Sequence, residues 1–356
     1  MRDQRLTQLA KILVGECVAI KPGQKVQIKT SSSLGMPLVE ACYIEALSLG
    51  AHPSYQMGNE RLMRHFLKHA NDDQINLPPT VSEFEAKYYD AHITIVADEN
   101  VSNLKNIDSE KLIVRSKLNK KFKDIIFEKP WVLTYYPTPA TAQVAQMSLT
   151  ELEDFYFNTV LTNWSALGKK MQKIANLLRD SELKIEGEKT NLTLSTKGRK
   201  WIDDDWKCNM PGGEVFTSPL VESVGGEIYF NYPLTHQGTT MKNIHLQFER
   251  GEVVKATASE NEAYLQKLIE TDVGAKRVGE IAFGVNEGCC QCMNNVLFDE
   301  KMAGTIHLAL GAGFDETGEN VNDSALHLDI IKCMRGKKSK VYDGKKLIYQ
   351  DGQFIL

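Results

Sequence analysis

The sequence predicts an α/β protein with two domains. The chain of 356 residues is too long for one small hydrophobic core. In its first half, apolar runs of strand length alternate with segments of helical periodicity, which favours a largely parallel sheet. Beyond about residue 183, strand-like segments dominate. We therefore expect an N-terminal α/β domain over residues 1–170 and a C-terminal α+β domain over residues 171–356.

The N-terminal elements follow from local patterns. Leu6, Leu9 and Leu13 recur at helical spacing and predict a helix over residues 2–17. The segment KPGQ is a turn, and the KVQIKTS segment after it alternates as a strand does. The same criteria predict strands at 25–31, 52–57, 91–98 and 131–137, and further helices at 35–50, 59–70 and 150–182.

The C-terminal elements are mostly hairpins. LKIEGEKTNLTLSTKGRKW alternates as strands do, with Gly, Asn and Thr between the runs. Residues 227–234 form another predicted strand. Two later strand pairs turn at Arg250-Gly251 and Asp351-Gly352, which are residues that tolerate the backbone of tight turns. One helix, Asn261 to Thr271, interrupts this series.

Composition narrows the function classes. A formal charge of -4 gives no reason to expect nucleic acid or an anionic membrane as a partner. The apolar runs are shorter than the roughly 20 residues of a membrane span, and the N-terminus lacks a continuous signal core. Seven cysteines, an odd number, favour a reducing cytoplasm over a disulfide framework. The early strands carry no glycine fingerprint for nucleotide binding.

Two histidines stand in apolar runs near the C-terminus. His307 lies in TIHLALG, and His327 and Asp329 lie two residues apart in SALHLDII. Residues two apart in a strand project from one face, so His327 and Asp329 point the same way. Such a pair, beside a strand with a further histidine, indicates half of a metal site. The alternative is a core histidine hydrogen-bonded to a buried aspartate.

Three glutamates supply further groups. Glu214 follows a Pro-Gly-Gly turn and Glu280 follows a glycine, each at the start of a strand, where the backbone can aim a carboxylate into a cleft. For either one alone, a solvated glutamate is the alternative. Glu300 lies in LFDEK. Carboxylates with two imidazoles suit paired Zn²⁺, Co²⁺ or Mn²⁺ better than a closed structural zinc site, so the C-terminal domain is expected to bind metal and carry catalysis.

Three other patches have simpler interpretations. The basic stretch KLNKKFK is expected to be a solvated helix face. The acidic run of Asp203, Asp204 and Asp205 is expected to face water, although it is able to hold a cation. A cysteine group lacks the second pair of a structural zinc site and is expected to hold plain reduced thiols; its members are Cys289, Cys290 and Cys292.

Five segments in order carry a family resemblance: PGGEVFTSP, VGEIAF, LFDEK, IHLALG and NDSALHLD. They resemble the dinuclear metallo-aminopeptidases of the aminopeptidase T, aminopeptidase S and PepS family. The close match covers roughly residues 205–332, and the chain looks like a shorter member. The resemblance implies an α/β N-terminal domain, a metal-bearing C-terminal domain and a homodimer that walls in the active site. It places the metal ligands on Glu214, Glu280, Glu300, His307, His327 and Asp329.

The resemblance also implies an activity. The chain is expected to be an aminopeptidase, a hydrolase that removes N-terminal residues from short peptides with two divalent metal ions and an activated water. Glu280 or Glu300 would act as the bridging ligand or the general base, and these roles stay open.

One departure from the family concerns the residue that follows the IHLALG strand. The family carries a tyrosine thought to assist the chemistry, and this chain has Phe314, which cannot donate a hydrogen bond to an oxyanion. A catalytically weak homologue is therefore one alternative. The other is an iron-dependent ring-cleaving dioxygenase of the same fold, which needs two histidines and one aspartate and lacks the paired glutamates.

Overall fold

The computed structural model describes residues 3–204, 206–236, 238–336 and 338–356. The chain divides into two compact units. The N-terminal unit comprises Met1–Leu161 and Trp206–Pro211, and the C-terminal unit comprises Thr162–Asp205 and Gly212–Leu356. The predicted limit between residues 170 and 171 falls inside helix α9, Trp164–Leu177, and stays a prediction.

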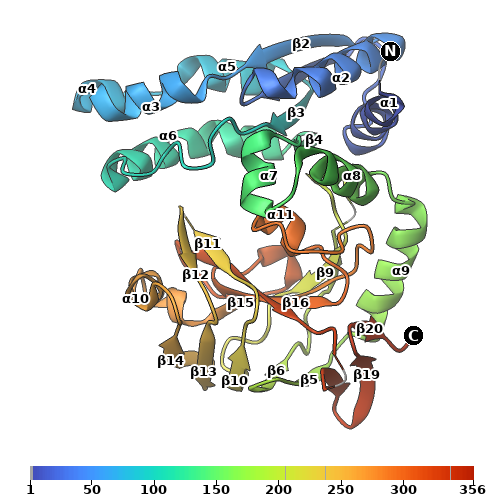
Figure 1. The fold of residues 1–356 in the computed structure, drawn as a ribbon, viewed down its shortest axis with the longest axis vertical. Helices are drawn as coiled ribbons and strands as arrows, with labels where there is room; N and C mark the ends of the chain where they lie inside the picture. The colour runs from blue at the N-terminus through green and yellow to red at the C-terminus, as the bar shows by residue number, and fades with distance from the viewer. Residues whose placement is uncertain (1–2, 205, 237, 337) are drawn as a thin grey trace. The chain divides into compact units, whose positions relative to one another are not determined.

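The N-terminal unit is built on a parallel five-stranded sheet of order β2-β1-β3-β4-β8 (Figure 1). The predicted largely parallel sheet is confirmed. Its strands are β1 Lys25–Thr30, β2 His52–Met57, β3 Ala91–Val96, β4 Trp131–Tyr135 and β8 Asn209–Met210. The helical segments are α1 Gln4–Lys11, the π-helix η1 Ile12–Cys17, η2 Ser33–Gly35, α2 Met36–Ser48, α3 Glu60–His69, α4 Asp72–Ile75, α5 Thr80–Tyr88, α6 Ser109–Phe127, α7 Pro139–Ala145 and α8 Leu149–Val160.

The core of this unit follows the predicted apolar pattern. Leu9 and Leu13 of the first helical segment and Ile28 and Ile93 of the central strands are fully buried. The helix expected over residues 150–182 is instead two helices, α8 and α9. The second has its own cap, because the side chain of Asn163 accepts a hydrogen bond from the backbone N–H of Ala166.

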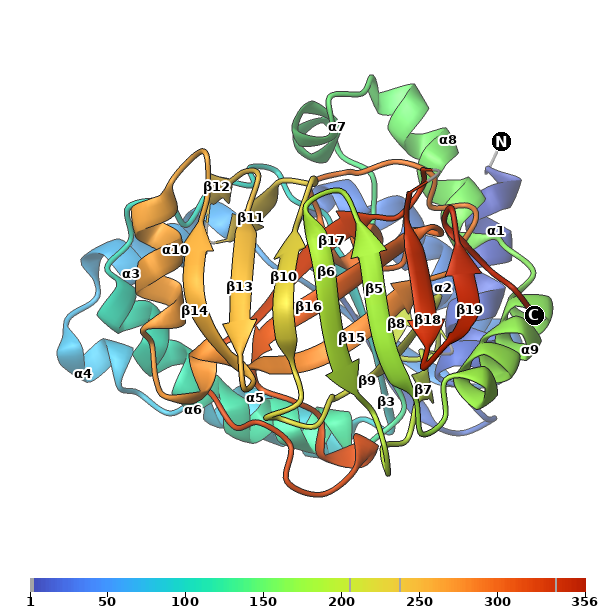
Figure 2. The ribbon, with the colours of Figure 1, turned by 90° about the horizontal axis from the view of Figure 1, so that it is seen from below.

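The C-terminal unit contains two larger antiparallel sheets in layers (Figures 1 and 2). The first has eight strands in the order β14-β13-β10-β6-β5-β18-β19-β20, and the second has the order β17-β16-β15-β9-β7. Strands β11 and β12 form a small separate ribbon. The predicted α+β architecture of this half is confirmed.

The strand bounds of this unit are β5 Glu182–Gly187, β6 Thr190–Ser195, β7 Ile202–Asp203, β9 Glu214–Thr217, β10 Gly225–Tyr229, β11 Leu234–His236, β12 Thr239–Met241, β13 His245–Glu249, β14 Glu252–Thr257, β15 Val278–Gly284, β16 Thr305–Gly311, β17 His327–Cys333, β18 Lys340–Asp343, β19 Lys346–Gln350 and β20 Gln353–Phe354. Besides α9, its helical segments are α10 Glu262–Ile269, η3 Gly274–Lys276, α11 Val296–Asp299 and η4 Asp315–Thr317.

Both predicted hairpins form. Arg250 and Gly251 have φ of 48° and 81°, and Asp351 and Gly352 have φ of 53° and 85°. Positive φ at both central residues is the requirement of a two-residue hairpin whose turn twists with the strands.

The strands β15 and β16 lie at the centre of the second sheet and are buried at every residue. A strand buried on both faces reads as a nearly continuous apolar run, which is why polar side chains within it stand out. Among the described residues, no helix is long and apolar enough to cross a membrane.

Candidate metal centre

Pairing in the second sheet places five candidate side chains on one face. Ala282 of β15 pairs with His307 of β16, and Gly284 of β15 pairs with Glu214 of β9. Paired residues share a face, as do residues two apart along a strand. Glu280 and Ala282 are two apart, so Glu214, Glu280 and His307 project from the same side of the sheet.

A second row completes the set. Glu280, Ala309 and Asp329 lie side by side on β15, β16 and β17, and His327 stands two residues before Asp329. The two carboxylates are separated only by the methyl group of Ala309, which leaves room for them to converge. The prediction that His327 and Asp329 lie on one strand is confirmed, because both belong to β17.

The imidazoles of His307 and His327 lie on either side of the Glu280 carboxylate. His307 Nε2 is 3.5 Å from Glu280 Oε1, and His327 Nε2 is 3.3 Å from Glu280 Oε2. His327 Nε2 also lies 3.2 Å from Asp329 Oδ1. Nδ1 of His327 is 2.9 Å from the carbonyl oxygen of Ala312. In neutral His327, Nδ1–H donates to that oxygen and leaves the Nε2 lone pair facing the carboxylates.

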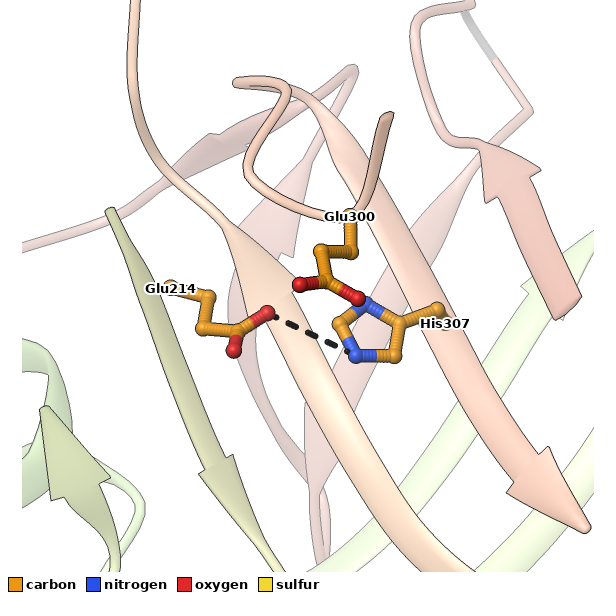
Figure 3. Close-up of side chains that lie close together, drawn as sticks. All are labelled: Glu214, Glu300 and His307. Atoms are coloured by element: carbon orange, nitrogen blue, oxygen red, sulfur yellow. Dashed lines mark ion pairs between the residues drawn. The ribbon is translucent and has the colours of Figure 1, made fainter. Parts of the chain in front are cut away.

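Figure 3 shows the carboxylates of Glu214 and Glu300 close to the imidazole of His307. Glu214 Oε2 is 3.5 Å from His307 Nε2. Glu300 ends the short helix α11. Its loop comes close because residue 284 is glycine: a Cβ there would meet the carbonyl oxygens of Met302 and, at 2.8 Å, Glu300. The structure therefore brings all six predicted ligands together.

Lys301 is a residue of this site that the sequence analysis missed. Its side chain is 1% exposed, and its Nζ lies 2.5 Å from Glu214 Oε1, 2.9 Å from Glu300 Oε1 and 2.8 Å from Asp204 Oδ2. The solvated interpretation of Asp204 is wrong, because its carboxylate is 12% exposed and paired with this ammonium. Asp205 lies outside the described residues. The sequence did carry one signal for Lys301, its position directly after the candidate ligand Glu300.

Asn286, which is fully buried, links the turn before Glu214 to the loop that carries Lys301. Its side-chain amide donates to the Gly212 carbonyl, and its backbone N–H donates to the Lys301 carbonyl. Two segments far apart in sequence are thus fixed relative to each other at the site.

Electrostatics show that the cluster requires positive charge. Burial acts to raise the pKa of Glu280, but hydrogen bonds from the two imidazoles lower it to about 2. Burial acts to lower the pKa of both histidines, and the carboxylates outweigh it, raising the pKa of His307 to about 9 and that of His327 to about 11. Burial raises the pKa of Glu214 and Glu300. In the metal-free protein, protons on the imidazoles balance the carboxylates, and divalent ions are able to replace them.

The donors fit divalent metal ions. Two groups have ligand atoms within 4.8 Å of one another: Glu214, Glu300 and His307, and Glu280, His307 and Asp329. Glu214 Oε2 and Asp329 Oδ1 are buried, and each lies near an imidazole nitrogen, at 3.5 Å from His307 Nε2 and 3.2 Å from His327 Nε2. These contacts need protons on the imidazoles, and divalent ions are able to take the place of those protons. Carboxylate and imidazole donors suit Zn²⁺, Co²⁺ and Mn²⁺.

Phe314 lies at the edge of this site. Its ring centroid is 5.2 Å from that of His327, at an interplanar angle of 67°, and 5.0 Å from that of Phe216. Its backbone N–H donates to Ser218 Oγ over 2.9 Å. The ring of Phe314 therefore lies beside a candidate metal ligand.

The basic stretch and the cysteine group lie elsewhere. In α6, Lys120 pairs with Asp124 and Lys121 with Glu83, so the basic stretch is a partly neutralised, exposed helix surface. In the cysteine group, Cys289 donates to the Phe298 carbonyl, and all three members are thiols outside any disulfide. That they bind no metal stays a prediction.

Comparisons with known proteins give the family. A model described as thermophilic metalloprotease (M29) matches residues 2–354. Aminopeptidase 2 of Geobacillus stearothermophilus is 25% identical over 382 residues, which cover 92% of each chain. Aminopeptidase T of Thermus thermophilus is 32% identical over 216 residues, 53% of this chain and 51% of that protein. Aminopeptidase PepS of Streptococcus thermophilus is 24% identical over 409 residues, 99% and 96% of the two chains.

Two solved structures share the fold. The structure of AmpT from Thermus thermophilus gives a TM-score of 0.85 at 22% identity and covers 99% of both chains. The 2,5-dihydroxypyridine dioxygenase from Pseudomonas putida KT2440 gives 0.57 at 14% identity, covering 98% of this chain and 96% of that one. The predicted resemblance, fold class and enzyme class, a hydrolase of the metallo-aminopeptidase type, are confirmed. Because the family model spans nearly its whole length, the chain belongs to the thermophilic metalloproteases of family M29, whose chemistry requires a divalent metal.

Proposed function

We propose that this protein removes N-terminal residues from short peptides and works with two divalent metal ions. The observation that carries the proposal is the convergence of four carboxylates and two imidazoles at one face of a buried sheet, with Glu280 in contact with both imidazoles. Such ions, when bound, lower the pKa of a water and polarise a peptide carbonyl. The relatives named as aminopeptidases support the choice of substrate.

Glu280 is proposed as the ligand shared by the two metal positions. One of its oxygens faces His307 and the other faces His327, so its carboxylate lies between the two imidazoles. Glu214 and Glu300 then belong to the position next to His307, and Asp329 to the position next to His327. Of the two roles left open by the sequence, bridging ligand and general base, Glu280 is thus proposed for the first.

Glu300 is proposed as the general base. Its Oε1, 2.9 Å from Lys301 Nζ, would also serve the metal position next to His307, and its Oε2 would take a proton from the attacking water and pass it to the leaving amine.

The expected substrate is a short peptide with a free N-terminus. This expectation is supported by the names of the relatives, three of which are aminopeptidases.

Metal analysis and a peptide screen test the proposal together. Protein purified without chelator and reconstituted with Zn²⁺, Co²⁺ or Mn²⁺ is expected to hold two ions per chain and to release N-terminal residues from dipeptides and tripeptides. N-acetylated versions of the same peptides serve as the control and are expected to resist. Two bound ions without hydrolysis of any peptide, whichever metal is used, would indicate the catalytically weak homologue and contradict the proposed activity.

The dioxygenase remains the second candidate because His307, His327 and Asp329 by themselves form a set of two histidines and one carboxylate, which suits a single Fe²⁺. The buried Glu214 and Glu280 argue against it, since they add charge that one iron does not need. One bound iron with cleavage of a dihydroxypyridine ring, and no peptidase activity, would favour this candidate.

The working state is also proposed to be a homodimer in a reducing cytoplasm. The family resemblance supports the dimer, and the seven cysteines, which stand as thiols, support the compartment. Light scattering of the purified protein at micromolar concentration is expected to give twice the chain mass, and a monomer mass would contradict the dimer.

A further inference from the structure

Lys301 places a fixed positive charge inside the proposed metal centre. Its Nζ contacts one oxygen of Glu214 and one of Glu300, and both are candidate ligands of the same metal position. Its third contact is Asp204, which belongs to neither group of candidate donors. The side chain is 1% exposed, so water does not screen this charge.

The two metal positions therefore have different surroundings. The position at Glu214, Glu300 and His307 has an ammonium within 2.5 and 2.9 Å of two of its ligands. Among the described residues, the ion pairs of Glu280 and Asp329 at the other position are made with imidazoles, which give up their protons when they bind a metal.

We infer that Lys301 is a positioning residue that makes the two positions unequal. Its ammonium holds Glu214 and Glu300 in place before metal arrives, and it lowers the affinity of the position that they share with His307. The position at Glu280, His327 and Asp329 is the tight one. This inference rests on the metal centre of the proposed function.

The contacts of Lys301 support both parts of this role, holding the two glutamates in place and lowering the affinity for metal. Lys301 contacts Oε1 of Glu214 and Oε1 of Glu300, and Glu214 Oε2 is turned to His307 Nε2 at 3.5 Å, so this oxygen is available as a ligand atom. The ammonium and a divalent ion would then share one carboxylate, and their repulsion in a buried site is strong. Lys301 thus keeps the acidic cluster intact without metal and opposes occupation of the nearer position.

Charge balance explains why a lysine is tolerated there. Five carboxylates meet at the site, from Asp204, Glu214, Glu280, Glu300 and Asp329. One ammonium and two divalent ions together neutralise them, whereas without Lys301 one negative charge would remain buried, which is costly.

Titration calorimetry with Mn²⁺ at pH 7.5 tests the inference, with elemental analysis for stoichiometry and melting temperatures for the metal-free proteins. The natural protein is expected to bind one Mn²⁺ tightly and a second at least about tenfold more weakly, because of the nearby like charge. Lys301→Met is expected to tighten the weaker position at least about tenfold and to lower the melting temperature of the metal-free protein. Lys301→Arg keeps the charge and is expected to keep the inequality.

Two further variants separate this role from a merely structural one. Asp204→Asn leaves the ammonium to Glu214 and Glu300 alone, so the weaker position is expected to weaken further, the opposite sign to Lys301→Met. Lys332→Met is the matched control. Lys332 is also 1% exposed, but it donates to the carbonyl groups of Glu188 and Tyr229, so its loss is expected to leave Mn²⁺ binding unchanged.

The outcomes are distinguishable. Equal affinities in the natural protein, or a weaker position that fails to tighten in Lys301→Met, overturn the role of Lys301 and leave the proposed function standing. If Lys301→Met does not fold, a weaker position that stays unchanged or tightens in Asp204→Asn overturns it instead. No bound Mn²⁺ in the natural protein and in every variant overturns the proposed function and this inference together.

Discussion

Restoring a hydroxyl at Phe314 should accelerate the reaction. The ring packs against two others: its centroid lies 5.2 Å from that of His327 and 5.0 Å from that of Phe216, and the Phe314 N–H donates to Ser218. Phe314→Tyr should therefore keep the ring in place and add a donor beside a candidate metal ligand. The substitution changes no charge, so the metal content should not change.

The size of the gain follows from the value of an oxyanion donor. One well-placed donor stabilises the transition state by about 3 kcal/mol, or roughly 100-fold in rate. The site of this chain is not built around the added hydroxyl, so about half of that stabilisation is expected. Half corresponds to about a tenfold increase in kcat. KM should change little, because the ground-state carbonyl does not need the donor.

The assay is steady-state hydrolysis of an amino-acid p-nitroanilide by the metal-loaded protein, with kcat and KM measured separately. Phe314→Leu is the control, since it removes the ring without adding a donor and should give no gain. An unchanged kcat in Phe314→Tyr with both metals bound would refute the reasoning, because another group would then supply the donor or the hydroxyl would miss the oxyanion.

Three further predictions follow from the same structure. Glu280→Gln should lower kcat more than about 100-fold while far-ultraviolet circular dichroism stays native, because the ligand proposed to be shared by the two metals is lost; near-normal activity with two metals bound would disprove its role. Metal content by elemental analysis should be unchanged when serine replaces all three members of the cysteine group, Cys289, Cys290 and Cys292; loss of one ion per chain would reveal a metal site there. Burial, reinforced by two nearby lysines, lowers the pKa of His92 from 6.5 to about 4. The folded protein then binds fewer protons than the unfolded chain, so about 3 kcal/mol of stability is present above pH 6.5 and lost as the pH falls to about 4. Urea unfolding of His92→Gln should lack that loss, and an unaltered pH profile would contradict it.

Local patterns in the sequence predict much of this fold because they depend on neighbouring residues. The alternation of His327 and Asp329 on one strand and the glycine turns of the two hairpins are short-range signals, and the structure confirms them. Strand pairing is different. Nothing local states that Glu280 and Asp329 lie in one row with Ala309 between them, because that depends on three strands meeting in one sheet. The family resemblance, not periodicity, joined these residues.

The features that local sequence patterns did not predict also depend on contacts between distant parts of the chain. Lys301 and Asp204 look like ordinary surface residues until a fold buries them against each other. Strand β8, at Asn209–Met210, returns to the parallel sheet of the N-terminal unit, although its neighbours in sequence belong to the other unit. A two-residue strand has no periodicity to detect, so its placement depends entirely on long-range contacts.

The row formed by Glu280, Ala309 and Asp329 has a consequence for how the protein matures. A slip of one residue between β16 and β17 would turn His327 and Asp329 to the opposite side of the sheet and abolish half of the donor set. Only the correctly paired sheet would then bind both of the proposed ions, and their binding free energy would stabilise that pairing over every slipped one. Metal uptake would thus select the correct strand register during folding, because only chains with that register are stabilised by the bound metal.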